Sequence, residues 1–166
     1  MKLGIRARLY GIVGAFAAAL LVLVSILLFL EFDALKTRRQ LELKGLVETA
    51  VSLVNSQYLL AKGGVLSEAE AKSRALEMIG KLRYQGDNYF WINDLHPTMV
   101  IHPVRPDLNG KDLTNIKDPN GKALFVEFAR VAKQNKSGIV NYMWPKPGFN
   151  KPVEKSSFVE LFEPWQ

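Results

Sequence analysis

Residues 83–102, RYQGDNYFWINDLHPTMVIH, hold an arginine, two tyrosines, a tryptophan, a phenylalanine and both histidines of the chain. The pattern predicts two short strands joined by a polar turn. Because side chains alternate along a strand, Tyr89, Trp91 and Asn93 are expected on one face of the first strand. Such a face is typical of a small-ligand pocket and also of a half-buried sheet, because aromatic residues favour strands. On alternation alone, the half-buried sheet is the preferred interpretation.

The stretch Leu9–Leu30 contains no charged residue. As a helix it would span about 33 Å, enough for a hydrocarbon core of about 30 Å. It is longer than the apolar part of a signal peptide, and its end, LLFLEFDAL, has no small-x-small cleavage site. We therefore expect an uncleaved transmembrane helix, with Lys2, Arg6 and Arg8 holding the N-terminus in the cytoplasm. The expected parts are a cytoplasmic N-terminus (1–8), a helix in the inner membrane (9–30) and an extracytoplasmic, periplasmic domain (31–166).

Charge and composition narrow the classes of function. The chain has 166 residues, a formal net charge of +6 and no cysteine. Lysine and arginine outnumber acidic residues by only three from residue 31 onward. No block of like charges is present, so nucleic-acid binding is not indicated. The absence of cysteine excludes disulfides, thiol catalysis and cysteine-based zinc sites.

A long helix is predicted to follow the membrane segment directly, from Glu31 to about Ala61. Apolar residues recur there with i, i+3, i+4, i+7 spacing, at Leu43, Leu46, Val47, Ala50, Val54 and Tyr58. At about 45 Å, this helix is longer than a small domain needs. Its apolar stripe therefore fits either one core helix or a helix that also contacts a second copy, so a homodimer and a monomer both stay open.

The rest of the chain predicts an α+β domain with an antiparallel sheet, because consecutive strands are joined by short turns. Ser67-Glu68-Ala69-Glu70 is a capping-box pattern that starts a second helix, which runs to about Leu82 with Arg83 at its end. Asp118 and Pro119 suit the start of a third helix. The two further predicted strands are Ile139–Trp144 and Val153–Phe162.

Lys155 is unusual on the last of these strands. Alternation puts it on one face with Val153, Ser157 and Val159, and a lysine on a mostly apolar face is costly unless an anion meets it. One interpretation is a lysine near the strand end whose ammonium reaches water. The other is a lysine that awaits a carboxylate.

The motifs RYQGDNYFWIND, MVIHP, LNGKDLTNIKDPNG and the PV-K-S-F-V-LFEPW strand occur in this order. In that order they resemble the single Cache domain of the second subtype, the PAS-like extracytoplasmic sensor of methyl-accepting chemotaxis receptors and some sensor kinases. The resemblance covers roughly residues 35–165. It implies a long helix packed behind a PAS-like antiparallel sheet, a short carboxylate ligand of the acetate, pyruvate, lactate or propionate class, and dimeric signalling through the membrane helix.

The same resemblance assigns candidate ligand-binding residues. Charge for a carboxylate would come from Lys155 or from Arg83 near the rim. Hydrogen bonds would come from the two tyrosines and the histidine, and the tryptophan would cover the short alkyl part. The remaining candidates are Tyr89, Trp91, His102 and Tyr142. Family members usually continue after the EPW motif into a last strand, so the sheet is expected to lack that strand and to leave the edge of Val153–Phe162 unpaired.

Three classes of function compete. The leading hypothesis is a membrane-anchored sensor of a small organic acid. The second is an interaction or assembly domain, or a truncated receptor fragment without function. An enzyme is not predicted, because His96 and His102 lack paired-ligand spacing and no catalytic constellation or cofactor motif accompanies them.

Overall fold

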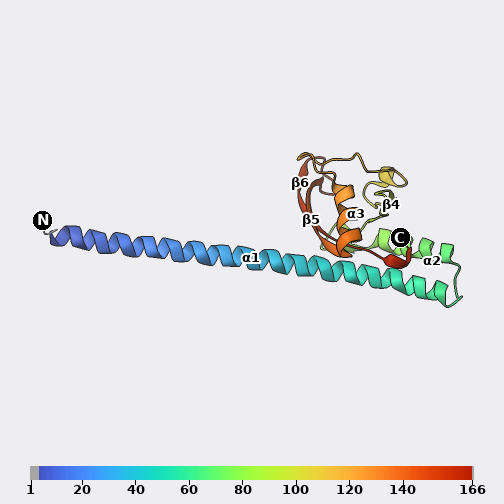
Figure 1. The fold of residues 1–166 in the computed structure, drawn as a ribbon, viewed down its shortest axis with the longest axis horizontal. Coiled ribbons are helices and arrows are strands. Elements are labelled where there is room, and N and C mark those ends of the chain that lie inside the picture. Colours follow the sequence, from blue (N-terminus) through green and yellow to red (C-terminus); the bar gives the residue numbers. More distant parts are fainter. Residues whose placement is uncertain (1–3, 166) are drawn as a thin grey trace. The chain divides into compact units, whose positions relative to one another are not determined.

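The computed structural model describes residues 4–165, whose elements are drawn in Figure 1. Lys2 lies outside the described residues, as does the side chain of Arg8, so the predicted cytoplasmic N-terminus is described only in part. The chain divides into two compact units, Met1–Leu41 and Glu42–Gln166.

The first helix, α1 (Ile5–Lys62), includes the predicted membrane segment and the predicted helix after it without a break. In the first unit its apolar side chains are exposed, among them Phe16, Leu21 and Phe29. Ser25 donates its hydroxyl to the Leu21 carbonyl at 2.8 Å, so this polar group is satisfied within the helix. By length and composition the helix could cross a membrane. The crossing itself stays a prediction.

In the second unit, α2 (Glu68–Lys81) begins at the predicted capping residue. The Ser67 hydroxyl accepts the Glu70 N–H at 3.2 Å. The Glu70 carboxylate pairs with Arg74 at 2.7 Å. Of the two hydrogen bonds of a capping box, the one made by the serine is therefore present, while the glutamate side chain is engaged with Arg74. The buried face includes Ala71, Ala75 and Ile79, as the helical spacing predicted.

The stretch 83–102 contains four short strands where two were predicted. They are β1 (Arg83–Tyr84), β2 (Asn88–Tyr89), β3 (Ile92–Asn93) and β4 (Met99–Ile101). β1 and β2 form a hairpin in which Arg83 is opposite Tyr89. Gln85 and Gly86 in the turn both have positive φ, 45° and 86°. The hairpin was missed because a single residue separates it from α2.

β3 and β4 pair antiparallel, with Ile92 opposite Ile101 and an irregularity next to it. The turn between them is held by Asp94, whose carboxylate accepts the N–H groups of His96 at 2.9 Å and Thr98 at 2.8 Å. In a tight turn, a side-chain oxygen of this kind accepts hydrogen bonds from backbone N–H groups that have no partner on a neighbouring strand. The polar turn was therefore predicted correctly.

The prediction that the third helix starts at Asp118 is wrong, because α3 is Leu124–Asn135. The Asp118 carboxylate accepts N–H groups of Asn120 and Lys122 at 2.9 Å each, closing a turn of its own. It also accepts the Met143 N–H at 2.9 Å, which ties the turn to a strand. An aspartate that closes a turn accepts the same kind of backbone N–H groups as an aspartate that begins a helix, so the sequence pattern fits both.

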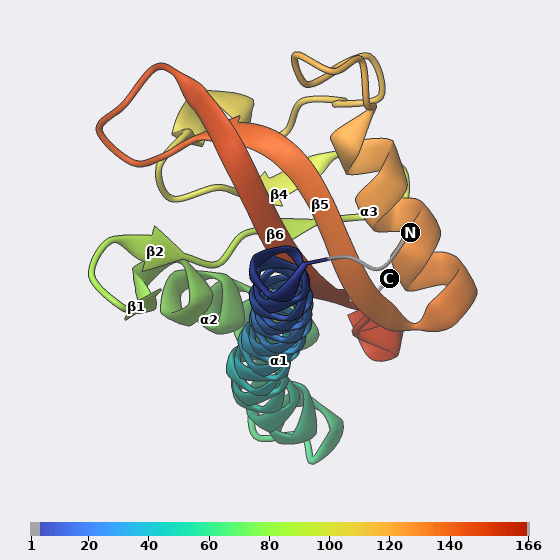
Figure 2. The ribbon, with the colours of Figure 1, turned by 90° about the vertical axis from the view of Figure 1, so that its left-hand side faces the viewer.

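The longest ladder of the described residues joins β5 (Ser137–Pro145) and β6 (Pro152–Glu160), which run side by side in Figure 2. The register places Tyr142 opposite Lys155 and ends with Pro145 opposite Pro152. Proline has no N–H, so neither residue of this last pair can donate to the ladder. Both strands agree closely with the prediction.

The core lies between α3, β5 and the 83–102 stretch. Gly138 allows α3 and β5 to approach closely, because a Cβ there would lie 2.7 Å from Val131 Cγ1. Short 3-10 turns, η1 (Pro106–Leu108) and η2 (Glu163–Trp165), complete the described elements. The antiparallel α+β class is thus confirmed. The buried cluster consists of Met99, Leu108, Leu113, Leu124, Phe125, Phe128, Val131, Val140 and Tyr142.

Candidate ligand-binding site

A small cavity collects most of the predicted ligand-binding residues. Its volume is about 10 Å³, the room of a single water molecule. Three segments build it: the 83–102 stretch, the start of α3 and β5. It is lined by Tyr89, Trp91, His102 and Tyr142 together with Leu124, Phe125, Phe128 and Trp144.

Lys155 lies beside this cavity on β6, opposite Tyr142 in the ladder. Its ammonium nitrogen is 4.8 Å from the centroid of the Tyr89 ring. The side chain is half-buried, and burial lowers its pKa to about 8. Among residues 4–165 no carboxylate forms an ion pair with it. The site therefore contains a partly desolvated cation that, among the described residues, contacts an aromatic ring and no carboxylate.

His102 is almost fully buried, with 3% of its surface exposed. Its Nδ1 accepts the Arg105 N–H at 3.0 Å, and its ring lies 4.9 Å from the Tyr89 ring. Burial, followed by the nearby charges of Lys155 and Arg105, lowers the pKa of His102 to about 4. The imidazole is therefore neutral at pH 7 and carries its proton on Nε2, because Nδ1 is the acceptor.

Two tyrosine hydroxyls stay protonated in this region. Tyr142 is buried and shares a 2.9 Å hydrogen bond with the Ser157 hydroxyl. Burial raises the pKa of Tyr142 and also that of Tyr89. Both groups can therefore donate a hydrogen bond to an anion without losing a proton.

Trp91 is half-buried and packs on Phe128, with 5.3 Å between ring centroids. Its Nε1–H donates to the Asn93 side-chain oxygen at 3.0 Å. The indole nitrogen is thus already engaged. What Trp91 offers to a ligand is the apolar face of its ring.

Arg83 lies apart from these residues. Its side chain is exposed, and its guanidinium donates to the carbonyls of Gly80 and Leu82 at 2.8 Å each. This is the favourable position for a cation at the C-terminal end of a helix. The structure thus brings five of the six predicted residues together and gives Arg83 a structural role at the end of α2.

Sequence reasoning missed Arg105, the second cation near the site. Arg105 is held by Asp107 through two hydrogen bonds, 2.8 Å from Nε and 2.7 Å from Nη2. The guanidinium lowers the pKa of Asp107 to about 2. Arg105 follows the candidate His102 by three residues, so its nearness in the sequence was a signal that could have found it. Trp144 also had a signal, since alternation placed it on the face of Tyr142.

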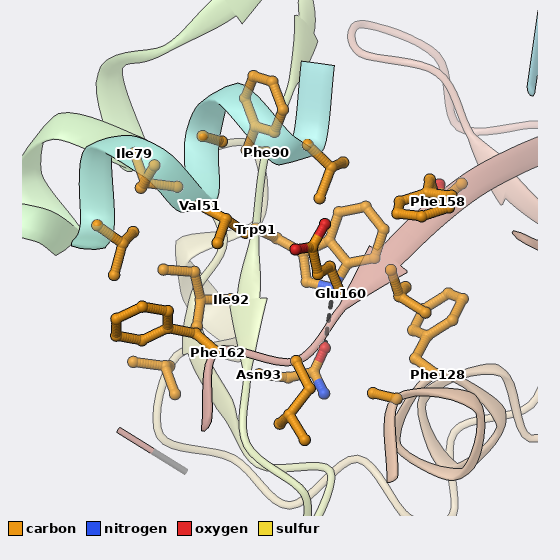
Figure 3. A pocket seen from close by; sticks show the side chains of 18 of the residues that line it. Val51, Ile79, Phe90, Trp91, Ile92, Asn93, Phe128, Phe158, Glu160 and Phe162 are labelled. Carbon is orange, nitrogen blue, oxygen red and sulfur yellow. Dashed lines mark hydrogen bonds between the residues drawn. The ribbon is translucent and has the colours of Figure 1, made fainter. Parts of the chain in front are cut away.

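A second, larger cavity of about 400 Å³ lies within the unit Glu42–Gln166 (Figure 3). α1, α2, β3 and β6 contribute to its wall, which is mainly apolar. Trp91 lines this cavity as well as the small one.

Comparison with known proteins agrees with this architecture. A family model described as a Cache domain (dCache_2) matches residues 27–166. The chain belongs to the Cache domain family. The family expected from the motif order is therefore confirmed.

Three similar proteins place this Cache domain among chemosensory proteins. It is 41% identical over 150 residues to the methyl-accepting chemotaxis protein McpP of Pseudomonas putida, covering 90% of this chain and 28% of that protein. A solved periplasmic sensor domain of a chemotaxis protein is 50% identical, with a TM-score of 0.76 over 78% of this chain and 90% of the other.

Another solved structure, described as the structural basis for carboxylic acid recognition by a Cache chemosensory domain, is 41% identical. Its TM-score is 0.77, and the match covers 80% of this chain and 90% of that one. The Cache domain described here spans 28% of the length of the curated chemotaxis protein it matches. The likeness therefore concerns the sensor part of such proteins.

Proposed function

We propose that this Cache domain binds a small carboxylate at Lys155 and passes the signal through the helix that crosses the inner membrane. The observation that carries the proposal is the half-buried Lys155 ammonium, which no described carboxylate neutralises. A partly desolvated cation gains more from an anion than an exposed one does, because water screens it less. An anionic ligand is therefore the natural partner.

The surrounding groups suit a carboxylate. Its oxygens would accept hydrogen bonds from the Lys155 ammonium, from the Nε2–H of His102 and from the hydroxyl of Tyr89 or Tyr142. The short alkyl part would rest against the Trp91 ring. The similar solved domain described as recognising a carboxylic acid supports this choice of ligand class.

The size of the cavity restricts the ligand. At about 10 Å³, it has no room for an organic acid as it stands. Binding therefore requires side chains of the wall to move, and each added methylene requires a larger movement. We infer a preference for two- and three-carbon acids: acetate, propionate, pyruvate and lactate.

The same proposal includes a membrane and a partner copy. The apolar, exposed first unit would lie in the inner membrane, and residues 31–166 would be periplasmic. The likeness to a periplasmic sensor domain supports this location. Homodimers through α1 would allow two domains to move their membrane helices relative to each other.

A thermal-shift assay tests the ligand class. The chain in detergent is heated with acetate, propionate, pyruvate or lactate, and separately with the neutral amides of the same acids. We expect one or more acids to raise the melting temperature and the matched amides to leave it unchanged. A folded sample that responds to none of the acids would contradict the proposal.

A further inference from the structure

The turn formed by residues 118–122 is joined to β5 by two hydrogen bonds. Asp118 accepts the Met143 N–H at 2.9 Å, and the Lys122 ammonium donates to the Asn141 carbonyl. Asn141 and Met143 are alternate residues of the strand, and alternate residues direct their backbone groups to the same edge. The turn therefore covers the edge of β5 that does not pair with β6.

Asp118 carries most of this connection. Its side chain is buried, with 7% of the residue surface exposed. One carboxylate oxygen closes the turn by accepting the N–H groups of Asn120 and Lys122, and the other accepts the N–H of Met143. The hydrogen bond from Met143, with those from Lys122 and Asn120, holds the pKa of Asp118 below its usual value, so the acceptor is charged at pH 7. Hydrogen bonds to a charged acceptor are stronger than those to a neutral one.

The same turn determines where α3 begins. Only Ala123 separates it from Leu124 and Phe125, which are 0% and 2% exposed and line the small cavity. The Phe125 ring meets the Trp144 ring edge-on, with 5.7 Å between centroids and 88° between planes. Trp144 follows Met143 directly on β5. The bond between Asp118 and Met143 thus holds two walls of the cavity together.

Nearer its other end, α3 is also close to β5. A Cβ at Gly138 would lie 2.7 Å from Val131 Cγ1, so the helix and the strand are packed without spare room there. The start of α3 and β5 therefore behave as one wall, and the 83–102 stretch forms the other. Since the cavity has a volume of only about 10 Å³, the separation of α3 from β5 limits the length of any acid that enters.

We propose that Asp118 is a positioning residue that limits the size of the acid. Because it holds β5 to the turn before α3, Leu124 and Phe125 stay close to Trp144, and acids longer than three carbons are excluded. The ligand class rests on the proposed function, whereas the position of the wall can be measured without a ligand.

Calorimetric titration of Asp118→Asn with acetate and butyrate tests the proposal. The amide has one acceptor oxygen, so it can close the turn or accept the Met143 N–H, but not both. We expect the ratio of butyrate to acetate affinity to rise by about tenfold or more, the usual effect of a methylene in an apolar pocket. A general loss of stability would weaken both acids alike and leave this ratio unchanged.

Asp112→Asn is the matched control. Asp112 is an exposed aspartate of the same loop, and its carboxylate accepts the Thr114 N–H at 2.8 Å, which closes another turn. The ratio should stay as in the unmodified protein. Lys122→Met removes only the bond to Asn141, so it should raise the ratio by a smaller factor and provides the test if Asp118→Asn does not fold.

A ligand-free measurement separates this proposal from the proposed function. The nuclear Overhauser effect between the Phe125 and Trp144 rings should weaken in Asp118→Asn and persist in Asp112→Asn. If the unmodified protein binds acetate and the variants keep its affinity ratio, the role of Asp118 is overturned and the proposed function stands. If the unmodified protein binds no acid, the proposed function is overturned, and an unchanged ring contact in Asp118→Asn would overturn the positioning role as well.

Discussion

The Lys155 ammonium lies 4.8 Å from the centroid of the Tyr89 ring, across the space between β6 and β2. A cation over an aromatic face is stabilised by the ring quadrupole, by about 1 kcal/mol or somewhat more when partly desolvated. This contact holds the charge in place without neutralising it. A ligand carboxylate can therefore still bind to it.

Replacement of Lys155 by alanine should weaken acid binding by about 30-fold or more, because loss of one partner of a desolvated charge pair costs about 2 kcal/mol or more. The melting temperature without ligand should change little, because the removal of a partly desolvated ammonium and the loss of its contact with the Tyr89 ring have opposite effects on stability. Calorimetric titration and thermal unfolding measure the two effects. Lys151→Ala, an exposed lysine at the same end of β6, is the control; equal affinities in the three proteins would exclude Lys155 as the anion site.

Acid affinity should depend on pH through the same lysine. The Lys155 pKa of about 8 in the free protein rises when an anion binds, because the anion favours the charged form. The affinity is then nearly constant below about pH 7 and falls as the pH rises through 8, by up to about tenfold per pH unit above that value. Lys155→Arg should remove the fall, because arginine keeps its charge at these pH values. A pH-independent affinity of the unmodified protein up to about pH 10 would contradict the assignment.

The stability of the fold should decrease in weak acid because of His102. Its pKa is about 4 in the folded state and near 6.5 when the chain is unfolded, so the unfolded state binds more protons between these values. The free energy of unfolding is therefore highest above about pH 6.5 and falls as the pH is lowered toward 4. Urea unfolding at several pH values measures this slope. His102→Gln should flatten it, whereas the exposed His96→Gln should keep it.

Phe128→Ala should lower the free energy of unfolding by about 3–5 kcal/mol, the usual range for a large buried aromatic residue. The Phe128 ring lies 5.3 Å from Trp91, 5.0 Å from Tyr142 and 5.6 Å from Phe125, measured between ring centroids. Its removal opens a cavity next to the small pocket. Val126→Ala on the exposed side of α3 is the control and should cost far less. A loss below about 1 kcal/mol would mean that the wall collapses around the gap.

Elements whose signal is local were predictable from the sequence. The strands around Tyr142 and Lys155 follow from alternation, and the start of α2 follows from the Ser67 cap. Asp118 shows the limit of such signals, because the same side chain can begin a helix or close a turn, and its bond to Met143 decides between them. Whether Asp118 begins a helix or closes a turn thus depends on a contact with a distant residue, which the local sequence pattern does not predict.

The candidate site was predictable in its residues more than in its geometry. Lys155 was identified because a cation on an apolar strand face needs an explanation, and the structure leaves it without a described ion pair. Arg105 was missed although it follows His102 by three residues, because it lies between the MVIHP and LNGKDLTNIKDPNG motifs on which the resemblance was based. Arg83 was assigned to the site from the family resemblance, as a charge near the rim, yet its guanidinium bonds carbonyls at the end of α2.

The proline pair that closes the β5–β6 ladder has a practical use. Beyond Pro145 and Pro152 the chain turns through exposed residues, including Phe149, and contributes no further ladder bonds. Because these 166 residues contain no cysteine, Phe149→Cys would give this chain a unique attachment point for a fluorescent dye. Exposed loop tips tolerate such changes well. A dye there would sit on the same hairpin as Lys155 and could report the occupancy of the pocket by a change in its emission.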